Sequence, residues 1–113
     1  MTAEFCLVYI TIDKLETAET LVKTLIDERI IACANIIEPV RSIYRWQGEI
    51  CVEKELIIIS KCQKSVYQAL EQRVKELHPY DCPCIVSLPV EAGLPDYFKW
   101  LTSETGPESV KKD

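Results

Sequence analysis

The chain has 113 residues, of which 48% are hydrophobic and 27% are charged, and its formal net charge is −5. This length and composition are typical of one globular domain, so we expect a single domain over residues 1–113. The net charge is negative and the chain has no run of Lys or Arg, which disfavours a nucleic-acid partner. The first apolar stretch is too short to span a bilayer, so no membrane association is expected.

The cysteine content does not indicate a disulfide framework. Three of the six cysteines lie inside apolar, strand-like runs, where a free thiol behaves as a small hydrophobic group. The N-terminal residues lack the basic segment of a signal peptide. The six are Cys6, Cys33, Cys51, Cys62, Cys82 and Cys84. We therefore expect free thiols in a reducing, cytoplasmic location.

Residues 5–12 form a nearly continuous β-branched and aromatic run, which predicts a central strand with both faces or both edges covered. Asp13 and Glu16 have the spacing of a capping box. Apolar residues then recur at helical spacing from Ala18 to Ile26, which predicts an amphipathic first helix directly after the strand.

A long hairpin is predicted next. Residues 32–37 have the composition of a strand, Pro39 predicts a bulge, and residues 40–46 continue the strand. Gln47-Gly48 predicts a tight turn, because glycine supplies positive φ in a two-residue hairpin loop. Residues 49–62 then predict the returning strand.

The tip of this hairpin must project past the body of the domain, because strands usually run about 5 to 6 residues. An apolar ribbon with free edge hydrogen bonds is a template for pairing, so we expect a closed, symmetric assembly to cover it. Glu53-Lys54-Glu55 is interpreted as a solvated segment of the ribbon. The apolar side chains of the tip are Ile43, Tyr44, Trp46, Ile50 and Val52.

The second half of the chain repeats the pattern of helix and strand. Ser65 and Gln68 have the spacing of another capping box, and the apolar stripe behind them predicts a second helix that Pro79 ends. Residues 84–90 predict the fourth strand. Residues 95–101 predict a short closing helix with proline at its start.

The residues from Ser103 onward are polar and predict a flexible tail over 103–113, which leaves an ordered core of about 4–102. The predicted order is βαββαβ plus a helix, which is the α+β, ferredoxin-like arrangement. Right-handed crossovers then give an antiparallel four-stranded sheet with both longer helices on one face. The opposite face of the sheet needs another cover.

Several segments are specific enough to indicate a family. They are Ala32-Cys33-Ala34-Asn35-Ile36, Ser42-Ile43-Tyr44 with Trp46, Gly48 and Glu49, His78-Pro79-Tyr80, Pro95-Asp96-Tyr97 and Trp100-Leu101. In these segments the chain resembles the CutA divalent-cation-tolerance family, and the resemblance extends from Phe5 to Leu101. It implies a ferredoxin-like fold, a tight homotrimer with strand pairing between subunits, and a link to tolerance of copper and other divalent ions. It also implies a likeness in architecture to the PII signalling proteins, whose trimers bind small ligands between subunits.

The resemblance is incomplete at two positions. Family members commonly carry Glu directly after the proline that follows His-Pro-Tyr, and this chain has Cys84 there. A thiol changes the ligand chemistry from hard to soft, so only His78 transfers unchanged as a candidate ligand. A cysteine that some members use at the end of the first strand is replaced here by Ile10.

Four residues of metal-binding type crowd into seven positions between the second helix and the fourth strand. They are His78, Asp81, Cys82 and Cys84. This set suits Cu(I) or Zn(II) better than Mg²⁺ or Ca²⁺, and both thiols reach one ion only if Pro83 breaks the strand alternation. In the structural alternative, His78 and Tyr80 form a helix-ending turn that contacts another subunit, and Cys84 enters the core.

Enzymatic interpretations meet chemical objections. A nucleophile pair of Cys84 or Cys33 with His78 lacks a Gly-rich turn or helix N-terminus to activate the thiol. The loop from Asp13 to Glu16 is acidic and contains no glycine, which argues against the phosphate cradle of an acylphosphatase. We therefore expect a protein that is not an enzyme.

Two hypotheses remain for the function. The first is a metal-responsive homotrimer that requires no cofactor and binds copper or another divalent ion. The second is a PII-like sensor or trimeric scaffold with a ligand or partner in the cleft between subunits, near Arg41 or Arg45. The residues expected at the subunit interface are Ile43, Tyr44, Trp46, Ile50, Tyr80 and Trp100.

Overall fold

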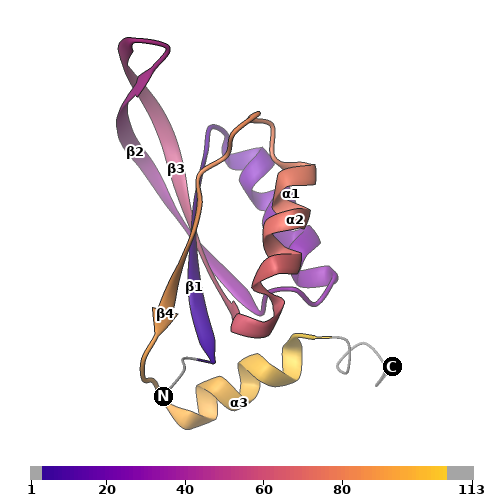
Figure 1. Ribbon diagram of the computed structural model, residues 1–113. Helices are drawn as coiled ribbons and strands as arrows, with labels where there is room; N and C mark the ends of the chain where they lie inside the picture. The colour runs from indigo at the N-terminus through magenta and orange to yellow at the C-terminus, as the bar shows by residue number, and fades with distance from the viewer. Residues whose placement is uncertain (1–3, 107–113) are drawn as a thin grey trace.

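The computed structural model describes residues 4–106, which form four strands and three α-helices (Figure 1). In chain order the elements are β1 (Phe5–Ile12), α1 (Leu15–Asp27), β2 (Cys33–Trp46), β3 (Glu49–Gln63), a 3₁₀ turn (Lys64–Val66), α2 (Tyr67–Leu77), β4 (Ile85–Val90) and α3 (Pro95–Glu104). This order confirms the predicted α+β, βαββαβ fold with a closing helix.

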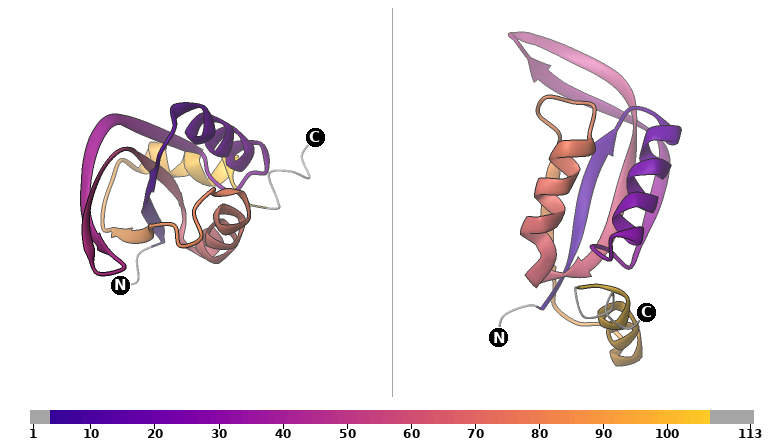
Figure 2. Two further views of the ribbon diagram at one scale, coloured as in Figure 1. Left: turned by 90° about the horizontal axis from the view of Figure 1, so that it is seen from above. Right: turned by 90° about the vertical axis from the view of Figure 1, so that its right-hand side faces the viewer.

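All four strands form one antiparallel sheet in the order β2-β3-β1-β4. β1 lies in the centre with both edges paired, as its continuous apolar run predicted. α1 and α2 lie side by side over one face of the sheet (Figure 2). The two crossovers therefore place both helices on the same side, which confirms that part of the prediction.

The core lies between this sheet face and the two helices. Burial alternates along β1, where every second residue from Cys6 to Ile12 is buried and its neighbours are half-buried. The same alternation continues in β3 from Leu56 to Cys62. The helices contribute Ala18, Leu21, Val22, Leu25, Leu70 and Val74. The apolar stripes that predicted both helices are thus the faces that pack on the sheet.

The hairpin of β2 and β3 is long, and its tip extends beyond the body of the domain (Figure 1). The register runs from Cys33 opposite Lys61 to Trp46 opposite Glu49, with an irregularity between Ile37 and Val40 where a bulge was predicted. The turn residues have φ of 49° and 84°, so its glycine occupies the left-handed region that a two-residue hairpin loop requires.

Both predicted capping boxes are wrong. The N-cap residues are Lys14 for α1 and Val66 for α2, and neither cap makes a side-chain hydrogen bond. Asp13 lies one residue too early, because Lys14 is still extended and the helix begins at the next residue. Ser65 lies inside the 3₁₀ turn, whose first N–H donates to the Glu4 carbonyl oxygen over 2.8 Å.

α3 extends further than predicted, to Glu104, so the predicted tail began too early. Thr105 is only 3% exposed, and its hydroxyl donates to the Leu101 carbonyl oxygen and accepts from Gln63. The N–H of Gly106 donates to the carbonyl oxygen of Arg29 over 2.8 Å. These contacts attach the end of α3 to the domain, while the rest of the predicted tail, 107–113, lies outside the described residues.

The second sheet face is covered by α3 only at one end, where Phe98 stacks on Phe5 with ring centroids 4.3 Å apart. α3 runs across the end of the sheet that lies far from the hairpin tip (Figure 1). In β1, the residues between the buried ones point to this second face, and so do the residues paired with them on the neighbouring strands. Together they form an apolar surface that we call the open face. It consists of Leu7, Tyr9, Ile37, Ile57, Ile59, Val86 and Leu88.

Candidate functional site

His78 lies at the C-terminal end of α2 and is buried. Its Nδ1 accepts the backbone N–H of Tyr80 over 3.1 Å, and its Nε2 lies 2.8 Å from the carbonyl oxygen of Thr11. A ring nitrogen that accepts a hydrogen bond from an N–H carries no proton, so the proton of the neutral ring is on Nε2. Nε2 therefore donates a hydrogen bond to the carbonyl oxygen of Thr11. Both ring nitrogens are therefore occupied, and a metal ion at either would have to displace a hydrogen bond.

The Tyr80 hydroxyl donates to Oε2 of Glu55 over 2.6 Å, and its ring packs edge-on against His78. Glu55 is only 7% exposed, so the interpretation of this part of β3 as solvated is wrong for Glu55. Burial, together with the nearby carboxylate of Glu55, raises the pKa of Tyr80. The loop after α2 is thus anchored to the end of β1 by His78 and to β3 by Tyr80.

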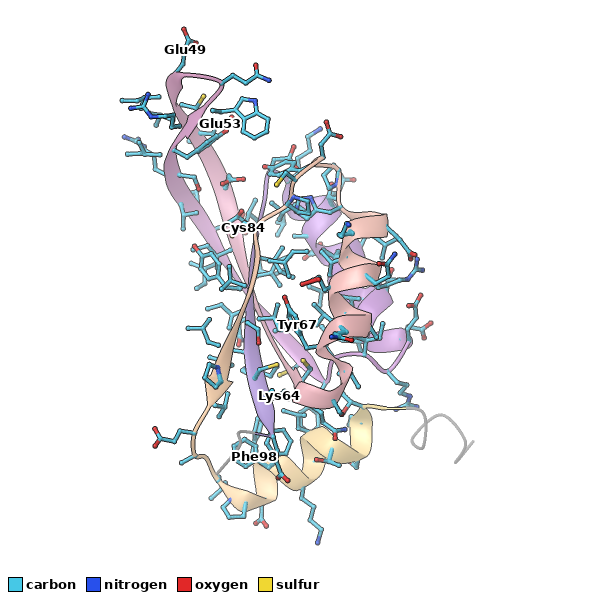
Figure 3. The ribbon with its side chains drawn as sticks, viewed as in Figure 1. Glu49, Glu53, Lys64, Tyr67, Cys84 and Phe98 are labelled. Atoms are coloured by element: carbon cyan, nitrogen blue, oxygen red, sulfur yellow. The ribbon has the colours of Figure 1, made fainter. Side chains whose placement is uncertain are left out.

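Asp81, Cys82 and Cys84 are exposed, in contrast to His78. They belong to an irregular segment that ends where β4 begins, and Cys84 directly precedes that strand (Figure 3). Cys84 therefore does not enter the core, and the structural alternative was wrong on that point. Within residues 4–106, no group of three or more His, Cys, Asp or Glu side chains is arranged to hold a metal ion. The four predicted ligands share a loop without forming one ligand cluster.

The hairpin tip presents its predicted interface residues to the exterior. Ile43, Trp46 and Ile50 are more than half exposed, and Ile50 reaches 69%. The Tyr44 hydroxyl donates to the carboxylate of Glu53, which raises the pKa of Tyr44 to about 12. Glu49 lies at the tip and Glu53 lower on the same strand (Figure 3). The tip thus combines exposed apolar side chains with carboxylates.

α3 carries the last predicted interface residue, Trp100, which is exposed and packs near Tyr97 with centroids 5.6 Å apart. The hydroxyl of Tyr97 lies 3.1 Å from the Cys33 sulfur, and Lys61 donates to Asn35 over 2.8 Å on the same face. Burial, followed by the contact with Cys33, raises the pKa of Tyr97 to about 12.

An apolar hollow of about 240 Å³ lies between α3 and the sheet. Its lining includes Phe5, Cys6, Leu7, Phe98 and Leu101. Sequence reasoning did not find this hollow, because its walls come from β1 and from a helix about ninety residues later in the chain. The only local signal was Pro95, which indicated where that helix begins.

Comparison with known proteins identifies the family. The family described as "CutA1 divalent ion tolerance protein" matches residues 6–104. The chain belongs to this family. Among CutA proteins, the divalent-cation tolerance proteins of Pyrococcus horikoshii and Thermus thermophilus are 46% and 44% identical over 99 residues. Each alignment covers 88% of this chain and 96% of the relative.

A solved CutA structure from Archaeoglobus fulgidus, described as periplasmic, superimposes on this chain with a TM-score of 0.86 at 33% sequence identity. The match covers 88% of this chain and 97% of the Archaeoglobus chain. The CutA fold therefore matches the sheet and helices described above, and the predicted family resemblance is confirmed. A periplasmic relative means that the family by itself does not assign a compartment. No described helix of this chain is both long and apolar enough to cross a bilayer.

Proposed function

We propose that this CutA-family chain is a metal-responsive binding protein for divalent-cation tolerance, acting as a homotrimer and not as an enzyme, with copper as its first candidate metal. The observation that carries the copper proposal is the exposed pair of thiols, Cys82 and Cys84, separated by a single proline. Thiolates are soft ligands that select Cu(I) and Zn(II) over hard ions such as Mg²⁺.

In this proposal Cys82 and Cys84 are the first ligands, and the exposed carboxylate of Asp81 is available as a third. His78, first predicted as a ligand, instead positions the loop through Thr11, because its two ring nitrogens are already hydrogen-bonded. Since the described chain assembles no cluster of three ligands, the coordination sphere is completed by loop movement, by solvent or by another subunit.

The homotrimer is supported by the amount of apolar surface that residues 4–106 leave uncovered. The open face and the hairpin tip both expose large apolar side chains, and such contiguous surfaces mark interaction sites. The hairpin strands also carry unpaired edges beyond the body of the domain (Figure 2). Tyr80 and Trp100 are placed at the same interface in this proposal, and closed symmetry satisfies all these surfaces together.

A reducing, cytoplasmic location is part of the proposal. All six cysteines are free in the described residues, including the pair Cys6 and Cys62 whose sulfurs are 3.5 Å apart. Disulfides form in oxidising compartments and are rare in the reducing cytosol, so free thiols within reach of each other favour the cytosolic location.

The test is a titration of the reduced, metal-free protein with Cu(I), Cu(II) and Zn(II). Native mass spectrometry reads subunit number and metal stoichiometry, and ultraviolet absorption reads thiolate-to-metal charge transfer. We expect a trimer with one metal per subunit, and loss of the charge-transfer band in Cys82→Ser and Cys84→Ser. Cys51→Ser is the matched control, since that thiol lies on the hairpin, away from the loop. Unchanged copper affinity in both loop variants would refute the proposed ligands.

The alternative is a PII-like sensor or scaffold whose ligand or partner occupies a cleft between subunits. The exposed aromatic and apolar side chains of the hairpin tip, which lie beside the exposed Arg45, are the observation that favours it, because aromatic and Arg side chains are enriched at interfaces. Failure to bind any of the three ions tighter than the micromolar range would favour this alternative. A change at the hairpin such as Arg45→Ala should then alter ligand binding, whereas it should leave copper binding at the loop unaffected.

A further inference from the structure

Two cysteines that the metal proposal does not use face each other inside the core. Cys6 of β1 and Cys62 of β3 are direct partners in the antiparallel register, and their sulfur atoms are 3.5 Å apart. Cys6 is 2% exposed and Cys62 is fully buried. We propose that this pair is a dithiol site that hydrogen peroxide oxidises to a disulfide between β1 and β3.

The backbone already has the separation that such a bond requires. Directly paired residues of an antiparallel sheet have Cα atoms about 4.5 to 5.5 Å apart, which lies within the range of about 4.4 to 6.8 Å found for disulfides. The sulfurs must approach to about 2.05 Å, a movement that rotation of the two side chains supplies. The register places no other two cysteines opposite each other, since Cys33 faces Lys61 and Cys51 faces Tyr44.

The surroundings of the pair assign different roles to the two sulfurs. Either thiol of the pair can donate the hydrogen bond between them. The contact with Cys62 lowers the pKa of Cys6 against the opposing effect of burial, and Ser87 and Lys64 lower it further. The same contact and burial raise the pKa of Cys62. Lys64 and Tyr67 lie where the chain leaves β3 and enters α2 (Figure 3). Because the thiolate is the reactive form, we assign Cys6 as the sulfur that attacks the peroxide and Cys62 as the sulfur that attacks second.

The burial of the two sulfurs limits which oxidants can reach them, since Cys6 is 2% exposed and Cys62 is fully buried. Cys6 also borders the hollow between α3 and the sheet, but its side chain alternates with those of Phe5 and Leu7 and points to the face that α1 and α2 cover. Hydrogen peroxide is small and uncharged, so it reaches a buried pair of thiols more readily than a peptide disulfide such as oxidised glutathione does. This difference in size predicts selectivity between the two oxidants.

The reaction consumes one peroxide and two thiols. The Cys6 thiolate attacks one peroxide oxygen, so that an S–O bond forms, the O–O bond breaks, and the departing hydroxide takes a proton to become water. The Cys62 sulfur then attacks the Cys6 sulfenic acid, forming the S–S bond and breaking the S–O bond. The Cys62 proton leaves with the second hydroxide as water. Two electrons pass from the thiols to the peroxide.

The test is oxidation of the reduced, full-length protein by hydrogen peroxide in the presence of a chelator, which makes the result independent of the metal proposal. Trypsin cleaves after Lys14, Lys61 and Lys64, so the disulfide joins peptides 1–14 and 62–64. We expect this linked pair, and loss of two hydrogens from the intact mass. Oxidised glutathione at the same concentration should form the bond much more slowly.

Cys6→Ser and Cys62→Ser should each abolish the linked peptide, whereas Cys82→Ser and Cys33→Ser should leave it unchanged. A variant with Ser at the four other cysteines keeps only this pair and should still form the bond, with circular dichroism confirming the fold. The proposal is overturned if peroxide only adds oxygen atoms to Cys6, or if the linked peptide appears only after denaturation.

Discussion

Removing the hydroxyl of Tyr80 tests whether the loop after α2 is held by a buried carboxylate. The hydroxyl donates to Glu55 over 2.6 Å, and Glu55 is 7% exposed. Tyr80→Phe keeps the ring that packs against His78 and removes only the donor. The variant therefore leaves a carboxylate in the protein with one partner fewer.

The expected loss of stability follows from the type of bond. A hydrogen bond to a charged group contributes about 1.5 to 3 kcal/mol, mostly through the cost of leaving the buried partner unpaired. Because Tyr80 itself is half-buried, water can partly replace the hydroxyl, which lowers the expected loss to about 1 to 2 kcal/mol.

The assay is denaturant unfolding at a fixed protein concentration, because the stability of an oligomer depends on concentration. Tyr67→Phe is the matched control, since its hydroxyl also donates to a glutamate, Glu71, but at an exposed site. A surface change of this kind should cost less than about 0.5 kcal/mol. Equal losses in the two variants would show that Glu55 is hydrated and would refute the reasoning.

The same pair predicts a dependence on alkaline pH. The folded state raises the pKa of Tyr80 above the usual value of about 10, which favours the protonated phenol. Its contribution is therefore fully present below about pH 10 and is lost as the pH rises through the folded pKa. The difference between the wild type and Tyr80→Phe should shrink over that interval, and a difference that grows instead would contradict the assignment of the shift.

Three further predictions follow from other contacts. His78→Ala should cost about 2 to 4 kcal/mol on denaturant unfolding, because it removes two hydrogen bonds and a buried ring, yet it should keep the copper charge-transfer band. Leu101→Ala should cost about 2 to 5 kcal/mol on denaturant unfolding, because this side chain is 2% exposed, and a loss near zero would contradict the packing of α3 on the domain. Arg73 lowers the pKa of Glu28, so the stabilising contribution of this pair is present above about pH 4.5 and is lost as the pH falls. As the pH is lowered from about 6 to 2, the unfolding midpoint should therefore fall less steeply in Glu28→Gln than in the wild type. Identical slopes in the two proteins would exclude a role for the pair.

The sequence predicted the parts of this fold that depend on local periodicity. The apolar run of residues 5–12 predicted a central strand, and alternation in the strands and stripes in the helices predicted which residues form the core. Pro39 and Gln47-Gly48 marked the bulge and the turn of the hairpin, because proline and glycine restrict or extend φ at the residue itself. The segments around His78 and Trp100 also sufficed for the family.

Local spacing failed where a cap depends on the path of the chain. The spacing of Asp13 and Glu16 matches a capping box, but the helix begins one residue later than the box requires. Ser103 begins a polar stretch, yet the chain continues to pack because Thr105 finds Gln63 of β3 as a partner. Neither outcome is contained in the few residues around it.

For the candidate sites too, the sequence predicted the residue types, whereas the fold decided their contacts. The sequence determined that thiols, a carboxylate and an imidazole would share one loop between α2 and β4. Only the tertiary structure turned His78 inward to Thr11 and left Cys82 and Cys84 exposed, because the ring nitrogens bind backbone groups from two separate segments. Likewise, fifty-six positions separate Cys6 from Cys62, and strand register alone brought their sulfurs together. Residue types and periods are local properties of a chain, whereas ligand geometry and thiol pairing depend on contacts between segments far apart in sequence.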